Sequence, residues 1–166
     1  QSRLLDDETC AILNSFIPPT NRLEGFDLMY ATYNDGWSFE ELYRLTHHLT
    51  PCILLIKSLQ KHALIGMFLT CSLGPPSIDI RGDGQCFVFR LNGELAGKYE
   101  WSKPEEHQTS PNHSKPEVNS ATWNQFAMCS NNYLAFGGSQ KYGTNAIRLD
   151  NDLSNCTCGH SDTYDN

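Results

Sequence analysis

The spacing of apolar residues changes at Pro51, from a helical to a strand-like pattern. In the stretch 38–49, phenylalanine and leucine recur three and four residues apart, which is the period of a helix with one buried face. Ser38 followed by Glu41 is a capping-box signature at its start, and Pro51 ends the pattern. This stretch therefore predicts an amphipathic helix.

Two further elements are expected before this helix. The stretch 6–16 predicts a short helix, because Asp6 or Asp7 can cap it and a pair of prolines follows it closely. The segment Phe26–Tyr33 is rich in aromatic and other apolar residues and ends at the turn signal Asn-Asp-Gly. It predicts a strand.

After Pro51, short apolar runs alternate with turn residues and predict a mainly β fold. The runs read CILLIKS, ALIGMFLT, CFVFRL, GKYEW, NQFAMCS, YLAFGG and NAIRLD. Many short strands at fairly regular spacing are typical of an antiparallel sandwich or barrel, here flanked by two short helices. Alternation along the strands predicts these inward-facing residues: Leu28, Tyr30, Leu54, Ile56, Met67, Phe87, Phe89, Phe126, Leu134 and Ile147.

Length and charge narrow the class of protein. A chain of 166 residues is expected to form one domain, residues 1–166. The net charge of −7 argues against a nucleic-acid surface, which needs clustered lysine and arginine. No apolar run is long enough to span a membrane. The polar, proline-containing stretch 102–122 predicts a long surface loop.

Seven cysteines favour a reducing compartment. The number is odd, and most of them lie inside apolar runs, where a free cysteine behaves as a small core residue. A secreted disulfide framework would place an even number in loops. The glycosylation sequons at Asn112 and Asn155 matter only in the secretory pathway.

The tripeptide Arg81-Gly82-Asp83 has two interpretations. On a secreted protein, an exposed loop carrying it could bind integrins. Alternatively, Gly82 and Gly84 both suit turn positions with positive φ that lead into a strand. The strand that follows at once and the reducing context favour a structural turn.

Cys156, Cys158 and His160 form a C-x-C-x-H cluster with three possible zinc ligands. Structural zinc usually takes paired cysteines from two places, and the second pair is missing, so the metal interpretation is the weaker one. Two exposed thiols could instead be redox-active. A loop with incidental cysteines is the plainest interpretation.

No catalytic constellation is visible in the chain. It contains no G-x-S-x-G nucleophile motif, and the glycines of FGGSQKYGTNAIRLD lack the lysine and the following helix of a phosphate-binding loop. We therefore expect a protein that is not an enzyme and carries no cofactor.

Five stretches follow one another along the chain in this order: GFDLMYATYNDGWSFEELYR, PCILLIKSLQKHALIGMFLT, GDGQCFVFRL, YLAFGG and RLDNDL. Together they resemble the motifs of the TLDc domain family, found in oxidation-resistance proteins. The stretch GFDLMYATYNDGWSFEELYR resembles its W-x-L-x-Y-S-T-x-x-x-G-x-S-x-x-x-L-Y-R. PCILLIKSLQKHALIGMFLT is similar to P-x-L-L-x-I-K-D…F-G-A-F, and GDGQCFVFRL to G-T-G-E-C-F-L-F. YLAFGG and RLDNDL resemble the family's L-x-x-G-G-G and L-x-x-D-x-D-L. The residues on family-motif positions are Gly36, Ser38, Pro51, Gly66, Gly82, Gly84, Gln85, Phe87, Gly137, Gly138, Asp150 and Asp152.

The chain departs from the family pattern in three places. Gln85 replaces a common glutamate, and Cys156 and Cys158 fall on a glycine and a serine of the family's tail loop. The family continues beyond the position of Asn166 with one or two strands, so we expect the domain to lack its last strand or strands.

The resemblance implies a sandwich of two antiparallel sheets and a non-catalytic interaction domain. It implies roles in oxidative-stress resistance and in regulating the vacuolar-type proton ATPase or membrane traffic, in the cytoplasm or peripherally on endosomal, lysosomal, vacuolar or vesicle membranes. Subunits of that ATPase are the expected protein partner, and a TBC module can flank such domains. A redox-active domain using Cys156 and Cys158 and an extracellular adhesion module using Arg81-Gly82-Asp83 remain the alternatives.

Overall fold

The computed structural model of this chain describes residues 3–22, 25–59, 61–74, 81–102, 124–139, 141–150, 153–164 and 166. Apart from Ser102, the predicted surface loop lies outside these residues, and so do the sequon at Asn112 and the motif position Asp152.

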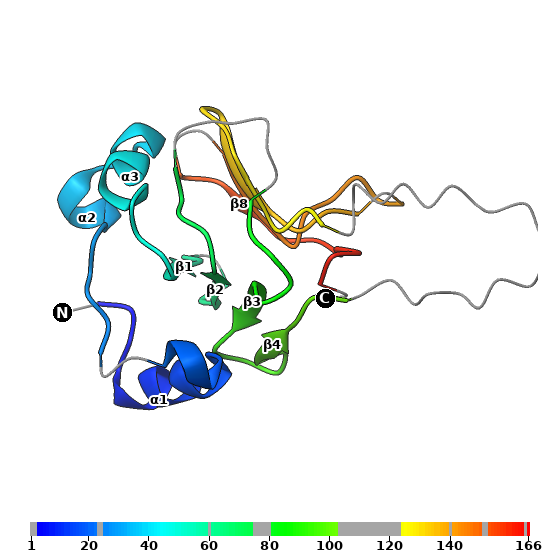
Figure 1. Ribbon diagram of the computed structural model, residues 1–166, viewed down its shortest axis with the longest axis horizontal. Coiled ribbons are helices and arrows are strands. Elements are labelled where there is room, and N and C mark those ends of the chain that lie inside the picture. Colours follow the sequence, from blue (N-terminus) through cyan, green and yellow to red (C-terminus); the bar gives the residue numbers. More distant parts are fainter. Residues whose placement is uncertain are drawn as a thin grey trace, which may run out of the picture.

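Two four-stranded antiparallel sheets form a β-sandwich (Figure 1). The first sheet has the order β1-β2-β3-β4 and the second the order β5-β6-β7-β8. The strands of the first sheet are β1 (Cys52–Lys57), β2 (Leu64–Leu69), β3 (Phe87–Arg90) and β4 (Gly97–Tyr99). Those of the second sheet are β5 (Ala127–Cys129), β6 (Tyr133–Phe136), β7 (Ile147–Asp150) and β8 (Cys156–Thr157). The mainly β sandwich and all seven apolar runs predicted as strands are confirmed.

Strand β8 was missed by the sequence analysis, which placed its two residues in a loop. It pairs with β7 through Arg148–Thr157 and Leu149–Cys156. A two-residue strand is too short to show alternation, so its pairing with β7 is a tertiary effect.

The first sheet is buried on both faces. Alternate residues of β2 and β3, such as Met67 and Val88, face the second sheet in the main core. Their neighbours Phe68, Phe87 and Phe89 belong to a second cluster with residues of helix α1 (Asp7–Phe16). Figure 1 shows α1 on the face of this sheet that points away from the second sheet. Phe87 and Phe89 are buried, as predicted, but under the helix instead of between the sheets.

Three short helices and one 3₁₀ turn complete the described part of the chain. α1 begins after Asp6, whose carboxylate accepts a hydrogen bond from the Thr9 N–H (2.8 Å). A 3₁₀ turn, η1 (Pro19–Asn21), and a four-residue helix, α2 (Thr32–Asp35), follow before α3 (Phe39–Thr46). Both predicted helices are therefore confirmed.

Helix α3 closes one end of the sandwich. Its residues Phe39, Leu42 and Tyr43 enter the main core, and the Tyr43 hydroxyl donates to the Ser130 carbonyl (2.9 Å). Ser38 accepts from the Glu41 N–H (3.4 Å), which is one half of the predicted capping box. The other half is absent, because the Glu41 carboxylate pairs with Arg44.

The predicted strand Phe26–Tyr33 is not formed. Residues 26–31 have no regular secondary structure, and the segment ends in α2. Leu28, predicted to face inward, is 47% exposed, whereas Tyr30 packs against the main core. A strand needs a neighbour for its backbone groups, and none of the described strands pairs with this segment.

No helix among the described residues is long and apolar enough to cross a membrane.

Candidate functional site

A run of exposed apolar side chains lies between α1 and α3. Phe26, Leu28, Met29, Tyr33 and Trp37 are each between 41% and 57% exposed. We call these five residues the apolar patch. Exposed large apolar side chains that follow one another along a short stretch of chain suit a contact site for a protein partner. Of these five residues only Leu28 was predicted to face inward, and no sequence pattern indicated that the other four would be exposed together.

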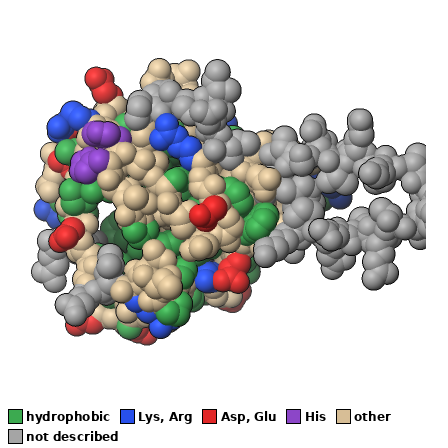
Figure 2. Space-filling model, viewed as in Figure 1, with side chains coloured by type: hydrophobic (Ala, Val, Ile, Leu, Met, Phe, Trp, Pro, Cys, Tyr) green, Lys and Arg blue, Asp and Glu red, His purple; other side chains and the backbone are tan. Residues whose placement is uncertain are grey.

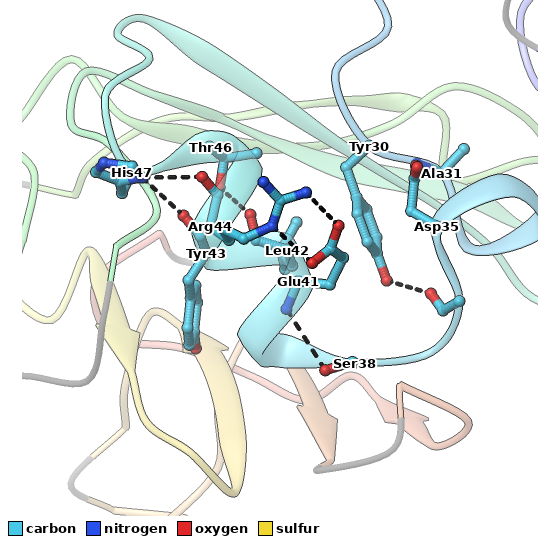
Figure 3. Close-up of polar contacts among 11 residues, drawn as sticks. Tyr30, Ala31, Asp35, Ser38, Glu41, Leu42, Tyr43, Arg44, Thr46 and His47 are labelled. Atoms are coloured by element: carbon cyan, nitrogen blue, oxygen red, sulfur yellow. Dashed lines mark hydrogen bonds and ion pairs between the residues drawn. The ribbon is translucent and has the colours of Figure 1, made fainter.

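Hydrogen bonds fix the backbone that carries the patch (Figure 3). The Tyr30 hydroxyl donates to the Gly36 carbonyl (2.6 Å), and the Asp35 carboxylate accepts from the Ala31 N–H (2.7 Å). Gly36, with φ of +85°, turns the chain from α2 toward Ser38 at the start of α3. The patch is therefore presented by a defined loop and short helix.

Aromatic and basic groups meet at one end of the patch. The Arg3 guanidinium lies over the Tyr33 ring, 4.1 Å from its centroid. This arrangement holds the Tyr33 ring in place while leaving it 42% exposed.

The two thiols predicted as redox candidates are close together and exposed. Cys156 pairs with Leu149 at the edge of the second sheet, and Cys158 follows two residues later. A hydrogen bond from the Cys156 thiol lowers the pKa of Cys158 to about 7, with smaller contributions from the charges of Lys61 and Arg90. The same hydrogen bond raises the pKa of Cys156. Cys158 is thus the group that carries a thiolate near neutral pH.

His160, the third member of the predicted cluster, points elsewhere. Its ring lies 3.4 Å from the Asp162 carboxylate and contacts the Asn166 carbonyl through Nδ1. Among the described residues, no three His, Cys, Asp or Glu side chains are arranged to hold a metal ion.

Three other cysteines, Cys52, Cys71 and Cys129, have raised pKa values instead. All seven cysteines lie in the described part of the chain and are free of disulfides. Burial raises the pKa of Cys52 to about 11 and that of Cys71 to about 12, and it raises the pKa of Cys129 as well. These thiols remain protonated at neutral pH and act as small core residues.

The Arg81-Gly82-Asp83 turn is tied to both sheets. Arg81 exchanges two backbone hydrogen bonds of 3.0 Å with Ala127, and its guanidinium lies against Gly74. The Asp83 carboxylate accepts from the Gln85 N–H (2.8 Å), and the Asp83 carbonyl accepts from the Cys86 N–H. The tripeptide thus serves as a turn that leads into β3.

Only one of the two glycines in this turn has the expected conformation. Gly82 has φ of +100°, as predicted, but Gly84 is not among the residues with positive φ. Gly84 is required for another reason: a Cβ there would lie 2.2 Å from the Trp101 ring. Trp101 covers Gly84 and packs edge-on against Phe126, so the glycine makes room for a core aromatic residue.

The motif residue Gln85 lines a hollow of about 340 Å³. Lys98 and Glu100 of the β4 edge also line it, and the Lys98 ammonium lies 4.4 Å from the Phe87 ring centroid. Lys98 and Glu100 form an ion pair (2.5 Å). Cys86 and Thr20 line the hollow as well, and nothing in the sequence placed Lys98 or Glu100 beside Gln85.

The remaining motif positions are spread over the fold and do not form one site. Pro51 precedes β1, Gly66 lies in β2 beneath the Phe89 ring, and Asp150 ends β7. Gly137 and Gly138 follow β6, where the Gly138 carbonyl accepts a hydrogen bond from the Asp162 N–H (2.8 Å). These residues therefore lie in turns, at strand ends or where two elements pack closely together.

A sequence model of the TLDc domain matches residues 1–166, the whole chain.

Proposed function

Because this chain belongs to the TLDc domain family, we propose that it is a non-catalytic interaction domain that binds a protein partner through its apolar patch. The single observation that carries this proposal is the exposure of the five patch residues, each 41% or more. Exposing so much apolar surface costs free energy unless a partner covers it.

The proposed partner is the peripheral part of the vacuolar-type proton ATPase, in the cytoplasm or on the membranes that carry this enzyme. The family resemblance suggests this partner and a role in oxidative-stress resistance. The thiol pair Cys156 and Cys158 lies at the β8 end of the second sheet and is not part of the apolar patch.

The test is direct binding to purified peripheral ATPase subunits, measured by biolayer interferometry with and without reductant. We expect the natural chain to bind in both conditions. The double variant Tyr33→Asp/Trp37→Asp should bind at least about tenfold more weakly. Each substitution removes the packing of an aromatic ring against the partner and places a carboxylate, which is costly to desolvate, at an apolar contact. Leu95→Asp is the matched control, since Leu95 is also exposed (63%) but lies outside the patch.

Two results would contradict the proposal. One is no binding by the natural chain. The other is equal loss of binding in the patch variant and in Leu95→Asp, which would mean that the patch has no special role.

A redox function is the second candidate, favoured by the thiol pair. The lowered pKa of Cys158 and the exposure of both thiols suit reaction with a peroxide. In such a reaction the Cys158 thiolate attacks one peroxide oxygen and releases hydroxide, which leaves a sulfenic acid. The Cys156 thiol then condenses with the sulfenic acid to give a disulfide and water. Mass spectrometry after peroxide treatment would detect the loss of two hydrogens, and Cys156→Ser should stop the reaction at the sulfenic acid.

A further inference from the structure

Cys156 and Cys158 lie at alternate positions of one extended stretch in the second sheet. Cys156 is paired with Leu149, a residue of the main core. The Gly159 N–H donates to the Asn145 carbonyl (2.9 Å), so this stretch stays bound to its neighbour beyond Cys158. Alternate side chains of an extended backbone point to the same face. The two sulfur atoms therefore share one face, where a hydrogen bond joins them.

Two cations of the first sheet act on this pair. Lys61 lies in the turn between β1 and β2, Arg90 ends β3, and the charges of both act on the Cys158 sulfur. Arg90 lies two residues after Val88, which faces the second sheet, so it is on the same side. Its Nε donates to the Asn92 carbonyl (2.7 Å), which holds the guanidinium at this end of the sheet. The thiol pair thus lies at a rim of the sandwich where the facing sheet supplies positive charge.

This positive charge is local. On the face drawn in Figure 2, the Lys and Arg side chains of the described residues are scattered among Asp and Glu and form no single broad patch. The whole chain carries a net charge of −7. Two cations beside two thiols therefore suit a small anionic centre and not an extended polyanion.

The two thiols as a donor set select the kind of ion. Structural zinc takes four ligands, and His160 is held by the Asp162 carboxylate (3.4 Å) and the Asn166 carbonyl instead of joining the thiols. Magnesium and calcium take oxygen ligands. Copper(I) is a soft ion that thiolates select, and it is stable with two of them in a linear arrangement. The pair therefore matches copper(I) better than zinc, magnesium or calcium.

We propose that Cys156 and Cys158 bind one copper(I) ion between their sulfur atoms. On binding, each thiol releases its proton to solvent and each sulfur donates an electron pair to the ion. Two copper–sulfur bonds form, and copper stays in the +1 state. Two thiolate charges and one copper charge leave the centre with a single net negative charge. Lys61 and Arg90 stabilise this charge.

The copper(I) site goes beyond the proposed interaction function and does not depend on it. It also differs from the redox candidate, in which the same two thiols are oxidised to a disulfide. A sulfur that is bound to copper(I) is not free to attack a peroxide. The two uses of the pair therefore exclude each other at any one moment and can be measured separately.

The test is a titration of the natural chain with copper(I), without oxygen and with reductant, against the coloured chelator bathocuproine disulfonate. We expect the chain to take copper(I) from the chelator. Cys156→Ser and Cys158→Ser should each bind at least about tenfold more weakly, because each removes one of the two thiolates. Cys10→Ser is the matched control, since it removes a half-buried thiol of α1 and should leave the affinity unchanged.

Two further measurements report on the site itself. X-ray absorption at the copper edge should find two sulfur ligands and no nitrogen or oxygen ligand. Bound copper(I) should block alkylation of Cys156 and Cys158 by iodoacetamide, measured by peptide mapping, and should leave the alkylation of Cys10 unchanged.

The contribution of the Lys61 charge is tested by substitution. Lys61→Gln should weaken copper(I) binding about two- to fivefold, which is the effect of one exposed charge interaction. Lys57→Gln is the matched control, because Lys57 is also exposed and ends β1 just before the turn that carries Lys61. Equal effects of the two variants would remove Lys61 from the site.

Four outcomes would overturn the proposal. These are no transfer of copper(I) from the chelator, unchanged affinity in Cys156→Ser or Cys158→Ser, a third sulfur ligand at the copper edge, and loss of the bound copper(I) to an excess of glutathione. A chain that forms the Cys156–Cys158 disulfide with peroxide but binds no copper(I) would keep the redox candidate and remove this site. Binding of the ATPase subunits tests the apolar patch and is independent of either result.

Discussion

At the scale of single residues, close contacts decide what a position tolerates. Gly84 and Gly97 look equivalent in the sequence, since both adjoin a strand or turn. A Cβ on Gly84 would lie 2.2 Å from the Trp101 ring, whereas a Cβ on Gly97 meets nothing within 4 Å. We expect Gly84→Ala to lower the free energy of unfolding by about 1–3 kcal/mol through overpacking.

Gly97→Ala is the control for this prediction and should change the free energy by less than about 0.5 kcal/mol. Urea unfolding followed by tryptophan fluorescence measures both. Equal effects of the two variants would mean that the Trp101 contact is not what requires Gly84.

The second residue-scale prediction concerns the thiolate of Cys158. Its pKa of about 7 depends first on the hydrogen bond from Cys156. The rate of alkylation of Cys158 by iodoacetamide should therefore rise with pH around a midpoint near 7, as the thiolate forms. In Cys156→Ala the hydrogen bond is lost, and the midpoint should move upward toward the ordinary thiol value of about 8.5.

Peptide mapping by mass spectrometry separates Cys158 from the other six cysteines. Half-buried Cys52, whose pKa is raised to about 11, is the internal reference and should not be alkylated below pH 9 in the folded chain. An unchanged midpoint in Cys156→Ala would show that the neighbouring thiol does not stabilise the thiolate.

At the scale of elements, α1 is the cover of an otherwise exposed sheet face. Leu13 is fully buried against the cluster that contains Phe68, Phe87 and Phe89. Leu13→Ala should therefore lower the free energy of unfolding by about 2–5 kcal/mol, since it removes buried methyl groups and leaves a cavity. The exposed helix residue Glu8 offers the control Glu8→Ala, which should have a much smaller effect.

Chemical denaturation measures this prediction, and binding of the dye ANS reports on the uncovered sheet face. A loss smaller than about 1 kcal/mol in Leu13→Ala, without dye binding, would show that the helix does not hold this face.

At the scale of the whole molecule, two half-buried thiols with raised pKa values predict that the fold loses stability in alkali. The pKa values of Cys52 and Cys71 are raised by burial to about 11 and about 12, above the value near 9 expected in the unfolded chain. A raised pKa means that the folded chain holds these protons more tightly than the unfolded chain does. The resulting contribution to the free energy of unfolding is therefore fully present below pH 9. It is lost as the pH rises from 9 through 11 and 12.

We therefore expect the free energy of unfolding to fall between pH 9 and 12. The double variant Cys52→Ala/Cys71→Ala should show a shallower fall over the same range. Burial raises the pKa of Tyr43 and Tyr164 too, so part of the fall should remain in the variant. Urea unfolding at a series of pH values, in reductant, measures the slopes. Identical slopes in the variant would contradict the assignment to these thiols.

The sequence by itself determined the mainly β fold, the two longer helices, seven of the eight strands in the described part of the chain and the turn at Gly82. These follow from local periods, caps and turn residues, which act over a few neighbouring positions. The resemblance to the family likewise came from motifs that remain in order along the chain.

Only the tertiary structure decided the rest. Phe87 and Phe89 face α1, β8 forms by pairing with β7, and the Phe26–Tyr33 segment stays unpaired. The apolar patch and the Cys156–Cys158 contact also required the fold to be seen. Which residues become neighbours, and which apolar side chains find no cover, depends on segments far apart in sequence. Local pattern cannot supply this information, because the same alternation fits either face of a sheet and either a paired or an unpaired edge.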